Sequence, residues 1–181
     1  MRKLTTDELN RLSVNQFREQ NKMPFRIVLD NIRSLQNIGS VFRTSDAFRL
    51  EGICLCGITA TPPHREIHRS ALGATESVSW QYFPTTLEAL QQLKSLDYFI
   101  IGIEQTDQST GLLKFMPPAG RKCALVFGNE VNGLSEEILP LLDACVEIPQ
   151  FGTKHSFNVA VSAGIVIWDL FVKTNQTGNV T

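Results

Sequence analysis

Residues 123–134 of this 181-residue chain read Cys-Ala-Leu-Val-Phe-Gly-Asn-Glu-Val-Asn-Gly-Leu, and this stretch decides the fold. The first five residues are apolar at consecutive positions, as in a strand that is buried on both faces of a parallel sheet. Glycine, asparagine and glutamate follow, and glycine allows positive φ and a close approach of backbone to ligand. We therefore interpret residues 123–127 as a buried strand that ends in a polar, ligand-binding loop.

Four other short runs share this apolar pattern, and we predict them to be further parallel strands: Phe25–Leu29, Ile53–Ile58, Tyr98–Ile103 and Cys145–Ile148. Helical patterns occupy most of the remaining sequence, at Leu4–Gln20, Ile38–Leu50, Thr85–Leu96, Leu134–Leu142 and Phe157–Val172. This alternation predicts an α/β fold with a mainly parallel sheet and helices on both faces. It divides the chain into an N-terminal helical extension at residues 1–24, one domain at 25–173 and a flexible tail at 174–181.

Capping residues mark the starts of several predicted helices. Thr5 and Glu8 have capping-box spacing, and so do Thr85 and Glu88. Ser135 is followed by two glutamates, which predicts an N-cap and a first turn that complements the helix dipole.

The composition is that of an ordinary globular protein, with 43% apolar and 19% charged residues. The longest apolar stretch, Val159–Val172, is shorter than the roughly 20 residues that span a bilayer, and it contains a serine, a glycine and an aspartate. The first residues show no signal-peptide pattern, so we expect a cytoplasmic protein without a membrane segment. The four cysteines have no C-x-x-C spacing, which favours reduced, buried core residues.

Charge is distributed unevenly along the chain, although the net charge is only −1. Residues 1–70 contain eleven Lys or Arg against seven Asp or Glu, and residues 71–181 contain six against eleven. A relatively basic N-terminal half suits phosphate groups of a nucleic acid. A solvated surface with chance asymmetry explains the charge equally well.

Two further polar clusters resemble the loop at 128–134 in composition. Residues 37–43 read Asn-Ile-Gly-Ser-Val-Phe-Arg, and residues 148–158 read Ile-Pro-Gln-Phe-Gly-Thr-Lys-His-Ser-Phe-Asn. Because the carboxyl ends of parallel strands lie at one edge of a sheet, we expect the clusters to form one composite site. Backbone groups at 126–128, 148–150 and 156–158 can read an adenine-like ring, and Arg43 can hold a phosphate by two parallel hydrogen bonds.

Several common sites are missing from the sequence. It has no G-x-x-x-x-G-K-[ST] loop, no G-x-G-x-x-G after the first strand and no G-x-S-x-G elbow. His64 and His68 are four residues apart, but Arg65 stands where a zinc-binding H-E-x-x-H motif has glutamate. We interpret residues 64–69 as an exposed basic stretch and predict no metal site.

The three clusters resemble, in order and internal spacing, the three motifs of the SpoU/TrmH family of RNA ribose 2′-O-methyltransferases in the SPOUT superfamily. The resemblance covers about residues 25–172. It implies an α/β fold with a C-terminal deep trefoil knot, S-adenosylmethionine as the methyl donor, and a homodimer with the last helix at its interface. The last predicted helix supports the homodimer independently, because it is apolar nearly all round and a sheet covers only one of its faces.

The resemblance also implies roles for individual residues. The catalytic residues carried over from the motifs are Asn37, Arg43, Glu130, Ser156 and Asn158. The residues expected to line the cofactor pocket are Glu104, Gly128, Ile148, Ser156 and Phe157. Arg43 is expected to bind the phosphate beside the reacting ribose and to stabilise alkoxide charge, because a guanidinium stays protonated and is a poor base.

The other residues of the set are expected to hold this arrangement in place. Asn37 would orient Arg43, Glu130 would fix its own loop or the geometry of Arg43, and Asn158 would hold the third motif. Two positions depart from the family pattern: Phe157 stands where leucine is usual, and Gln150 stands where methionine is frequent. Both changes leave backbone contacts intact, so we expect a reshaped pocket.

Structured RNA is the expected partner, with tRNA favoured over ribosomal RNA. Only about two dozen residues precede the first predicted strand, so we expect RNA to contact the dimer surface, Arg11, Arg18 and Lys22 of the first helix, and residues 64–69. Three alternatives stay open at this point: a catalytically silent RNA-binding module of the same fold, a knotted enzyme that methylates a base, and a flavodoxin-like ligand-binding domain.

Overall fold

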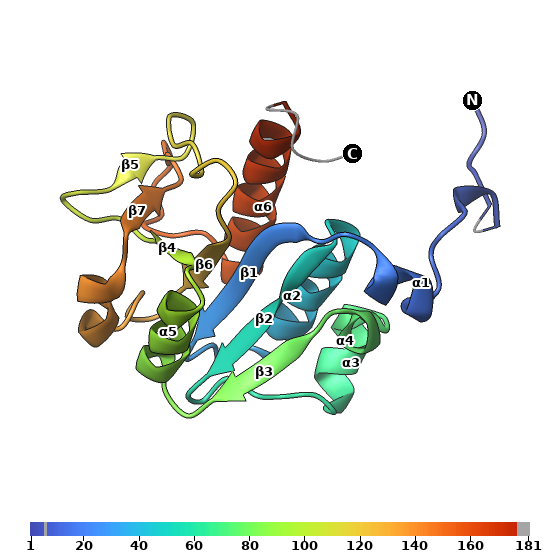
Figure 1. Cartoon of the computed structure of the whole chain (residues 1–181), viewed down its shortest axis with the longest axis horizontal. Coiled ribbons are helices and arrows are strands. Elements are labelled where there is room, and N and C mark those ends of the chain that lie inside the picture. Colours follow the sequence, from blue (N-terminus) through green and yellow to red (C-terminus); the bar gives the residue numbers. More distant parts are fainter. Residues whose placement is uncertain (6, 177–181) are drawn as a thin grey trace.

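The computed structural model describes residues 1–5 and 7–176. At its centre is a seven-stranded sheet in which every strand pair is parallel, with the order β3-β2-β1-β6-β4-β7-β5 (Figure 1). The strands are β1 (Met23–Asp30), β2 (Leu50–Cys56), β3 (Trp80–Phe83), β4 (Phe99–Ile103), β5 (Thr110–Gly111), β6 (Cys123–Phe127) and β7 (Ala144–Glu147). The predicted α/β fold with a parallel sheet is confirmed, and all five predicted strands are present. The trefoil knot stays a prediction.

Helices cover both faces of the sheet, as predicted. The α-helices are α1 (Val14–Glu19), α2 (Leu35–Ala47), α3 (Arg65–Ala71), α4 (Ala74–Ser77), α5 (Thr86–Ser95) and α6 (Val159–Gln176), and the 3-10 helices are η1 (Asp7–Leu9) and η2 (Glu136–Leu141). One core cluster joins the sheet to α2, α3, α4 and α6, and a second joins its other face to α5 and η2.

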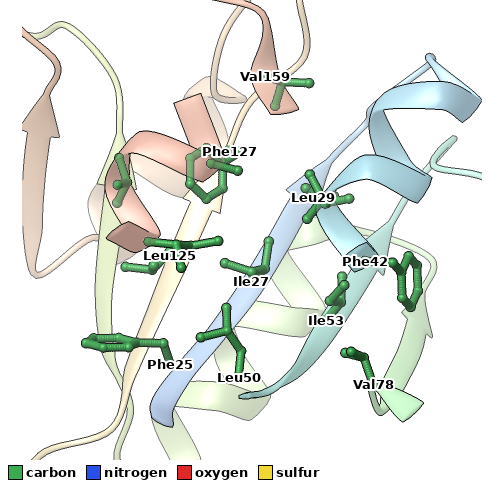
Figure 2. Packing of buried hydrophobic residues seen from close by; sticks show 14 of the residues in the cluster. Phe25, Ile27, Leu29, Phe42, Leu50, Ile53, Val78, Leu125, Phe127 and Val159 are labelled. Atoms are coloured by element: carbon green, nitrogen blue, oxygen red, sulfur yellow. The ribbon is translucent and has the colours of Figure 1, made fainter. Parts of the chain in front are cut away.

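Alternate residues of the central strands feed these two clusters. The side chains of Ile27 and Leu29 in β1 meet those of Leu125 and Phe127 in β6, and Phe42 of α2 lies beside Ile53 of β2 (Figure 2). The intervening residues, such as Val28 and Val126, pack against α5 and η2. Each buried side chain of this size stabilises the fold by about 1.5–3 kcal/mol, which explains why β6, the strand with all five residues buried, is apolar at every position.

The N-terminal residues do not form the single helix that we predicted over Leu4–Gln20. The predicted cap at Thr5 is present, since its N–H donates to Glu8 Oε2 at 2.7 Å, but only the three-residue η1 follows. Asn10 has a φ of 46°, which ends η1, and Ser13 starts α1 as its N-cap. Isolated helices of this length are marginal in water, so each forms only where packing or a cap supports it.

The segment after Leu134 also differs from the prediction, because it forms the 3-10 helix η2 instead of an α-helix. Pro140 lies inside it and cannot donate the backbone hydrogen bond that an α-helix requires. Ser135 makes no side-chain cap, since its Oγ donates to the buried Asp30 instead. Thr85 does cap α5 as predicted, with its Oγ1 accepting from Glu88 N at 3.2 Å.

Elements that the sequence did not reveal are short or exposed. The strand β3 has three exposed residues out of four, β5 contains two residues, and α3 and α4 span seven and four. The last helix continues past the predicted Val172 to Gln176, and residues 177–181 of the predicted tail lie outside the described residues. No described helix combines the length and the apolarity needed to cross a membrane.

The cysteines are reduced, as predicted. All four are free; Cys54, Cys56 and Cys123 are buried, and Cys145 is partly exposed. Burial raises the pKa of Cys123 to about 12, which makes it a poor nucleophile at neutral pH.

Gly39 determines how closely α2 and α3 pack. A methyl group at position 39 would lie 2.0 Å from Ser70 Oγ and 2.4 Å from the carbonyl oxygen of Ile67. We expect Gly39→Ala to lower the free energy of unfolding by about 1–3 kcal/mol, because α3 must move away from α2. Denaturant titration measures this change.

Gly111 in β5 provides the matched control. No atom lies within 4 Å of a methyl group at that position. Gly111→Ala should therefore leave stability unchanged or raise it by about 0.5–1 kcal/mol. Equal stability of Gly39→Ala and the unmodified chain would show that the close contact of α2 with α3 is not required.

Candidate functional site

A cavity of about 530 Å³ opens at the carboxyl ends of β4, β6 and β7. Its walls come from the loops at residues 104–106, 128–134 and 147–157. This volume lies in the range that holds small ligands and cofactors. All five residues that we expected to line a cofactor pocket are in its wall: Glu104, Gly128, Ile148, Ser156 and Phe157.

The loop after β6 is folded tightly on itself. The backbones of Asn129 and Gly133 exchange two hydrogen bonds of 3.1 and 3.0 Å. Within the loop, Asn129 Oδ1 accepts from the N–H groups of Val131 at 3.0 Å and Asn132 at 2.9 Å. The loop is therefore a small hairpin whose backbone groups are largely satisfied internally.

Two positions in this loop require glycine. A methyl group on Gly128 would lie 2.1 Å from the carbonyl carbon of Gly133 and 2.3 Å from Leu134 N. Gly133 has a φ of 69°, and a methyl group there would lie 2.1 Å from Glu104 Oε2. The Glu104 carboxylate fastens the loop from the neighbouring strand end, accepting from Leu134 N at 3.1 Å and Gln105 N at 2.9 Å. Gly133 thus has the positive φ that glycine allows, and both glycines make close contacts within the protein, whereas their approach to a ligand stays a prediction.

The charge of the cavity indicates which ligands it favours. Among the described residues, its wall contains Glu104, Glu130 and Glu147 and neither lysine nor arginine. A phosphate would be repelled by these carboxylates, whereas a neutral ring or a cationic group is compatible with them. Apolar contact is available from Ile148 and Phe157, which lie in the same wall.

The side chain of Asn37 connects the three sequence clusters. Its Nδ2 donates to Glu130 Oε1 at 2.9 Å, and its Oδ1 accepts from Asn158 Nδ2 at 3.1 Å. The helix α2, the loop after β6 and the start of α6 therefore meet at one amide. Asn158 also caps α6, with its Oδ1 accepting from Ala160 N at 2.9 Å. Asn158 therefore joins the start of α6 to α2, and its role in positioning the third motif stays a prediction.

Arg43 lies apart from the cavity in the single chain. Six helical positions separate it from Asn37, which is a rotation of about 240° and a rise of about 9 Å. Arg43 is exposed and lines a different groove of about 520 Å³, between α2 and the N-terminal segment, together with Arg11 and Arg49. Asn37 contacts Glu130 and Asn158, and the hydrogen bonds of the described residues do not include the expected contact between Asn37 and Arg43.

The sequence did not point to Asp30, which supports the site from inside the protein. Asp30 ends β1 and is fully buried. Its Oδ2 accepts from both the N–H and the Oγ of Ser135 at 2.8 Å, and its Oδ1 accepts from Thr86 Oγ1 at 2.5 Å. It thereby ties the end of the cavity loop to β1 and α5. A charged residue that closes an apolar strand was the only signal in the sequence.

The histidines of α3 fit the predicted basic surface stretch. His64 and His68 are exposed, and His64 caps the helix with its Nδ1 accepting from Glu66 N at 3.2 Å. Within residues 1–5 and 7–176, no group of three or more His, Cys, Asp or Glu side chains is arranged to hold a metal ion.

Comparison with known sequences identifies relatives along most of the chain. A family model described as the SpoU rRNA Methylase family matches residues 24–168. A putative TrmH family tRNA/rRNA methyltransferase of Staphylococcus saprophyticus is 26% identical over 92% of this chain. The 23S rRNA (guanosine-2′-O-)-methyltransferase RlmB of Neisseria meningitidis is 31% identical over 80% of it, and the tRNA (guanosine(18)-2′-O)-methyltransferase TARBP1 of Mus musculus is 33% identical over 79%. The matches span 66%, 56% and 9% of these relatives, respectively.

Solved structures show the same fold at lower sequence identity. The A. aeolicus TrmH/SpoU tRNA modifying enzyme superimposes with a TM-score of 0.80 at 21% identity, covering 92% of this chain and 84% of that one. The SpoU methyltransferase AviRb of Streptomyces viridochromogenes, in complex with the cofactor AdoMet, has a TM-score of 0.77 at 22% identity. That match covers 88% of this chain and 64% of AviRb.

The role of the Asn37 side chain can be tested by replacing its N–H donor with an oxygen. Asn37→Asp keeps the shape but places a carboxylate oxygen opposite Glu130 Oε1, where an N–H now donates at 2.9 Å. We expect the chain to fold and the amides of residues 129–133 to exchange hydrogen roughly five- to tenfold faster, because a hydrogen bond of about 1 kcal/mol is lost.

Asn15→Asp on the exposed surface of α1 adds the same charge away from the network and should leave this exchange unchanged. Unaltered exchange at 129–133 in Asn37→Asp would mean that the amide does not hold the loop. Hydrogen exchange read by mass spectrometry measures both variants.

Proposed function

Since this chain belongs to the SpoU rRNA methylase family, we propose that it transfers a methyl group from S-adenosylmethionine to a ribose 2′-hydroxyl of structured RNA. One observation carries the proposal: beside an acidic cavity at the strand ends, Asn37 joins the three family motifs by hydrogen bonds to Glu130, which lines the cavity, and to Asn158. The relatives named 2′-O-methyltransferases support the ribose hydroxyl as the target.

The residues of the cavity fit S-adenosylmethionine. Its adenine ring needs close backbone contact, and the loop at residues 128–134, which lines the cavity, can provide it. Its sulfonium and ammonium groups are cationic, which suits a wall with three glutamates. When bound, the cofactor supplies an electrophilic methyl group. AviRb, which has the same fold, binds AdoMet, and this also supports the assignment.

The protein's own part in the reaction is to place and polarise the RNA. The loops at residues 104–106, 128–134 and 147–157 would hold the methyl donor, which would supply its methyl group to the 2′-oxygen, and the hydroxyl proton would leave to an RNA phosphate or water. The Asn37, Glu130 and Asn158 network fixes the loops that align these groups, so most of the rate gain is proximity. Ser156 lies in the cavity wall, where its hydroxyl can hydrogen-bond to ligand or RNA.

Arg43 is assigned to an RNA phosphate beside the reacting ribose. In the described part of the chain, Arg43, Arg11 and Arg49 make no hydrogen bond or ion pair with other side chains, and they share one groove. Such guanidinium groups bind phosphate bidentately. Because this groove is separate from the cavity, the role requires the RNA, or a second copy of the chain, to connect the two.

A homodimer is the assembly that we propose. Two apolar residues of α6 are strongly exposed in the single chain: Val161 at 50% and Trp168 at 57%. Trp168 stacks on Phe171 and meets the edge of Phe48 at the end of α2, which makes an aromatic patch. A second subunit that covers this patch would remove it from water.

We favour tRNA over ribosomal RNA as the substrate. The mouse relative and the A. aeolicus enzyme are described as acting on tRNA, whereas the Neisseria relative is described as acting on 23S rRNA. We place the protein in the cytoplasm, because RNA substrates and four free cysteines fit a reducing compartment.

Cofactor binding tests the cavity. We expect the chain to bind S-adenosylmethionine and Gly128→Ala to bind it at least tenfold more weakly, a loss of about 1.4 kcal/mol, because the new methyl group pushes the loop at 133–134 away. Gly111→Ala is the control, since no atom lies within 4 Å of a methyl group there. Titration calorimetry measures the affinities. Normal binding by Gly128→Ala would exclude this loop from the cofactor site.

Methyl transfer tests the reaction and Arg43. The substrates are total tRNA and, separately, ribosomal RNA from a strain that lacks this gene, with the product nucleosides identified by mass spectrometry. We expect a 2′-O-methylated nucleoside from tRNA, roughly 100-fold slower transfer by Arg43→Ala and a clear loss by Arg43→Lys, because an ammonium lacks the guanidinium fork.

Cofactor affinity should stay normal in both Arg43 variants, and Arg121→Lys should retain full transfer, because Arg121 precedes β6 and lines neither the cavity nor the Arg43 groove. Full activity of Arg43→Lys would refute the bidentate role. Methylation of ribosomal RNA alone would refute the preference for tRNA.

A further inference from the structure

A third groove, of about 510 Å³, lies between α3 and the edge strand β3; it shares no lining residue with the cavity and only Glu76 with the Arg43 groove. Its walls combine an exposed tryptophan, two prolines and cationic side chains: Pro62, Pro63, His64, Arg65, His68 and Trp80. We propose that this groove binds single-stranded RNA, with a base stacked on Trp80 and the adjoining phosphates bound by Arg65 and Arg69. The proposal rests on the proposed function for the identity of its partner as RNA.

The tryptophan is placed to receive a flat ring. Trp80 starts β3, the outermost strand, so no further strand covers it (Figure 1). It is 37% exposed. Two residues further on, Tyr82 projects from the same side of the strand and is 46% exposed, with its hydroxyl donating to the Gly57 carbonyl at 3.1 Å. Two aromatic rings are therefore exposed along one strand, and a hydrogen bond holds the second ring in place.

The cations are available on the neighbouring helix. Arg65, His68 and Arg69 are exposed, and their spacing of three and four residues puts them on one side of α3. In residues 1–5 and 7–176, their side chains make no hydrogen bond or ion pair. Glu66 on α3 and Glu76 in the groove wall are the nearby acids, so phosphate fits the Arg65 and Arg69 side and not the Glu76 end.

This pairing of groups favours RNA as the occupant over a peptide. Every nucleobase has a face that stacks on tryptophan, and arginine and histidine planes bind both bases and phosphates. Structured RNA presents such unpaired bases in its loops. The groove is also close to the family motifs in the fold, since α3 crosses α2 in direct contact with Gly39, two residues from Asn37. The start of α6, which lines the cavity, and α3, which lines the groove, share one core cluster and so lie on the same face of the sheet.

The chain contains only two tryptophans, Trp80 and Trp168, and this allows a direct optical test. Trp168→Phe leaves Trp80 as the sole indole. The full chain is titrated with single-stranded oligoadenylate of about 12 nucleotides, a length within the range that such grooves bind. We expect saturable quenching of Trp80 fluorescence. In the otherwise unmodified chain, Trp80→Leu should weaken oligoadenylate binding roughly tenfold, measured by fluorescence anisotropy of a labelled oligonucleotide.

Matched variants separate stacking from charge and from misfolding. Arg65→Ala with Arg69→Ala should weaken binding and reduce its dependence on salt, whereas Arg121→Ala, placed before β6 and three strands away, should do neither. Because Trp80 is exposed, the thermal unfolding of Trp80→Leu should match that of the unmodified chain. Oligoadenylate binding by Tyr82→Leu tests the same surface at a second aromatic ring.

The outcomes distinguish this proposal from the proposed function. Quenching by oligoadenylate without methyl transfer to any RNA would support the groove and refute the enzyme. Methyl transfer with no quenching and with an unchanged KM for tRNA in Trp80→Leu would support the enzyme and overturn the groove. If the protein is the proposed enzyme and the groove also binds RNA, Trp80→Leu should raise the KM for tRNA at least fivefold while kcat and cofactor affinity stay unchanged. Binding of a proline-rich peptide instead of oligoadenylate would also overturn the proposal.

Discussion

The side-chain amide of Asn37 is the contact on which the candidate site depends. An amide can donate and accept at once, and Asn37 does both, toward Glu130 and Asn158, which lie 93 and 121 residues further along the chain. Aspartate could not donate to Glu130, and serine is too short to reach both partners. The amide itself is held by α2, where the neighbouring Ile38 is buried and Gly39 lets α3 pack against the helix. The positions of two distant loops therefore depend on how one helix packs.

Loops form the walls of the cavity, yet the contacts around them restrict their movement. Glu104 fastens the loop after β6 from one side, and the buried Asp30 fastens its end through Ser135. Both carboxylates accept backbone N–H groups that would otherwise be unpaired near the core, and leaving them unpaired would cost about 1–3 kcal/mol each. A preformed backbone surface of this kind can recognise a ring by shape and hydrogen bonds without charged side chains.

The sequence was sufficient to predict the fold class and the composition of the cavity wall, for one physical reason. Strands that are apolar on both faces must be parallel and covered by helices, and polar clusters at their carboxyl ends must then share one edge. Hydrogen bonds between residues far apart in the chain leave no comparable pattern in the sequence. Ser135 looked like a helix cap, but Asp30, 105 residues away, binds its hydroxyl and N–H instead. The strand β3 was missed because its residues are mostly exposed. The separation of Arg43 from Asn37 was in principle readable, since positions six apart on a helix do not share a face.

The distribution of charge indicates that the cavity and the outer surface favour different ligand groups. The described wall of the cavity holds three glutamates and no lysine or arginine, while Arg11, Arg43 and Arg49 lie together in a separate groove. An acidic wall cannot neutralise the phosphate next to a reacting ribose, so if the chain methylates RNA, that neutralisation has to come from outside the cavity. Affinity for RNA would then fall with salt through the arginines, whereas affinity for the methyl donor would depend on the backbone contacts and glutamates of the cavity, which salt screens less than exposed charges. On this reasoning, the choice of RNA and the binding of the methyl donor are set by different residues, and each can change without disturbing the other.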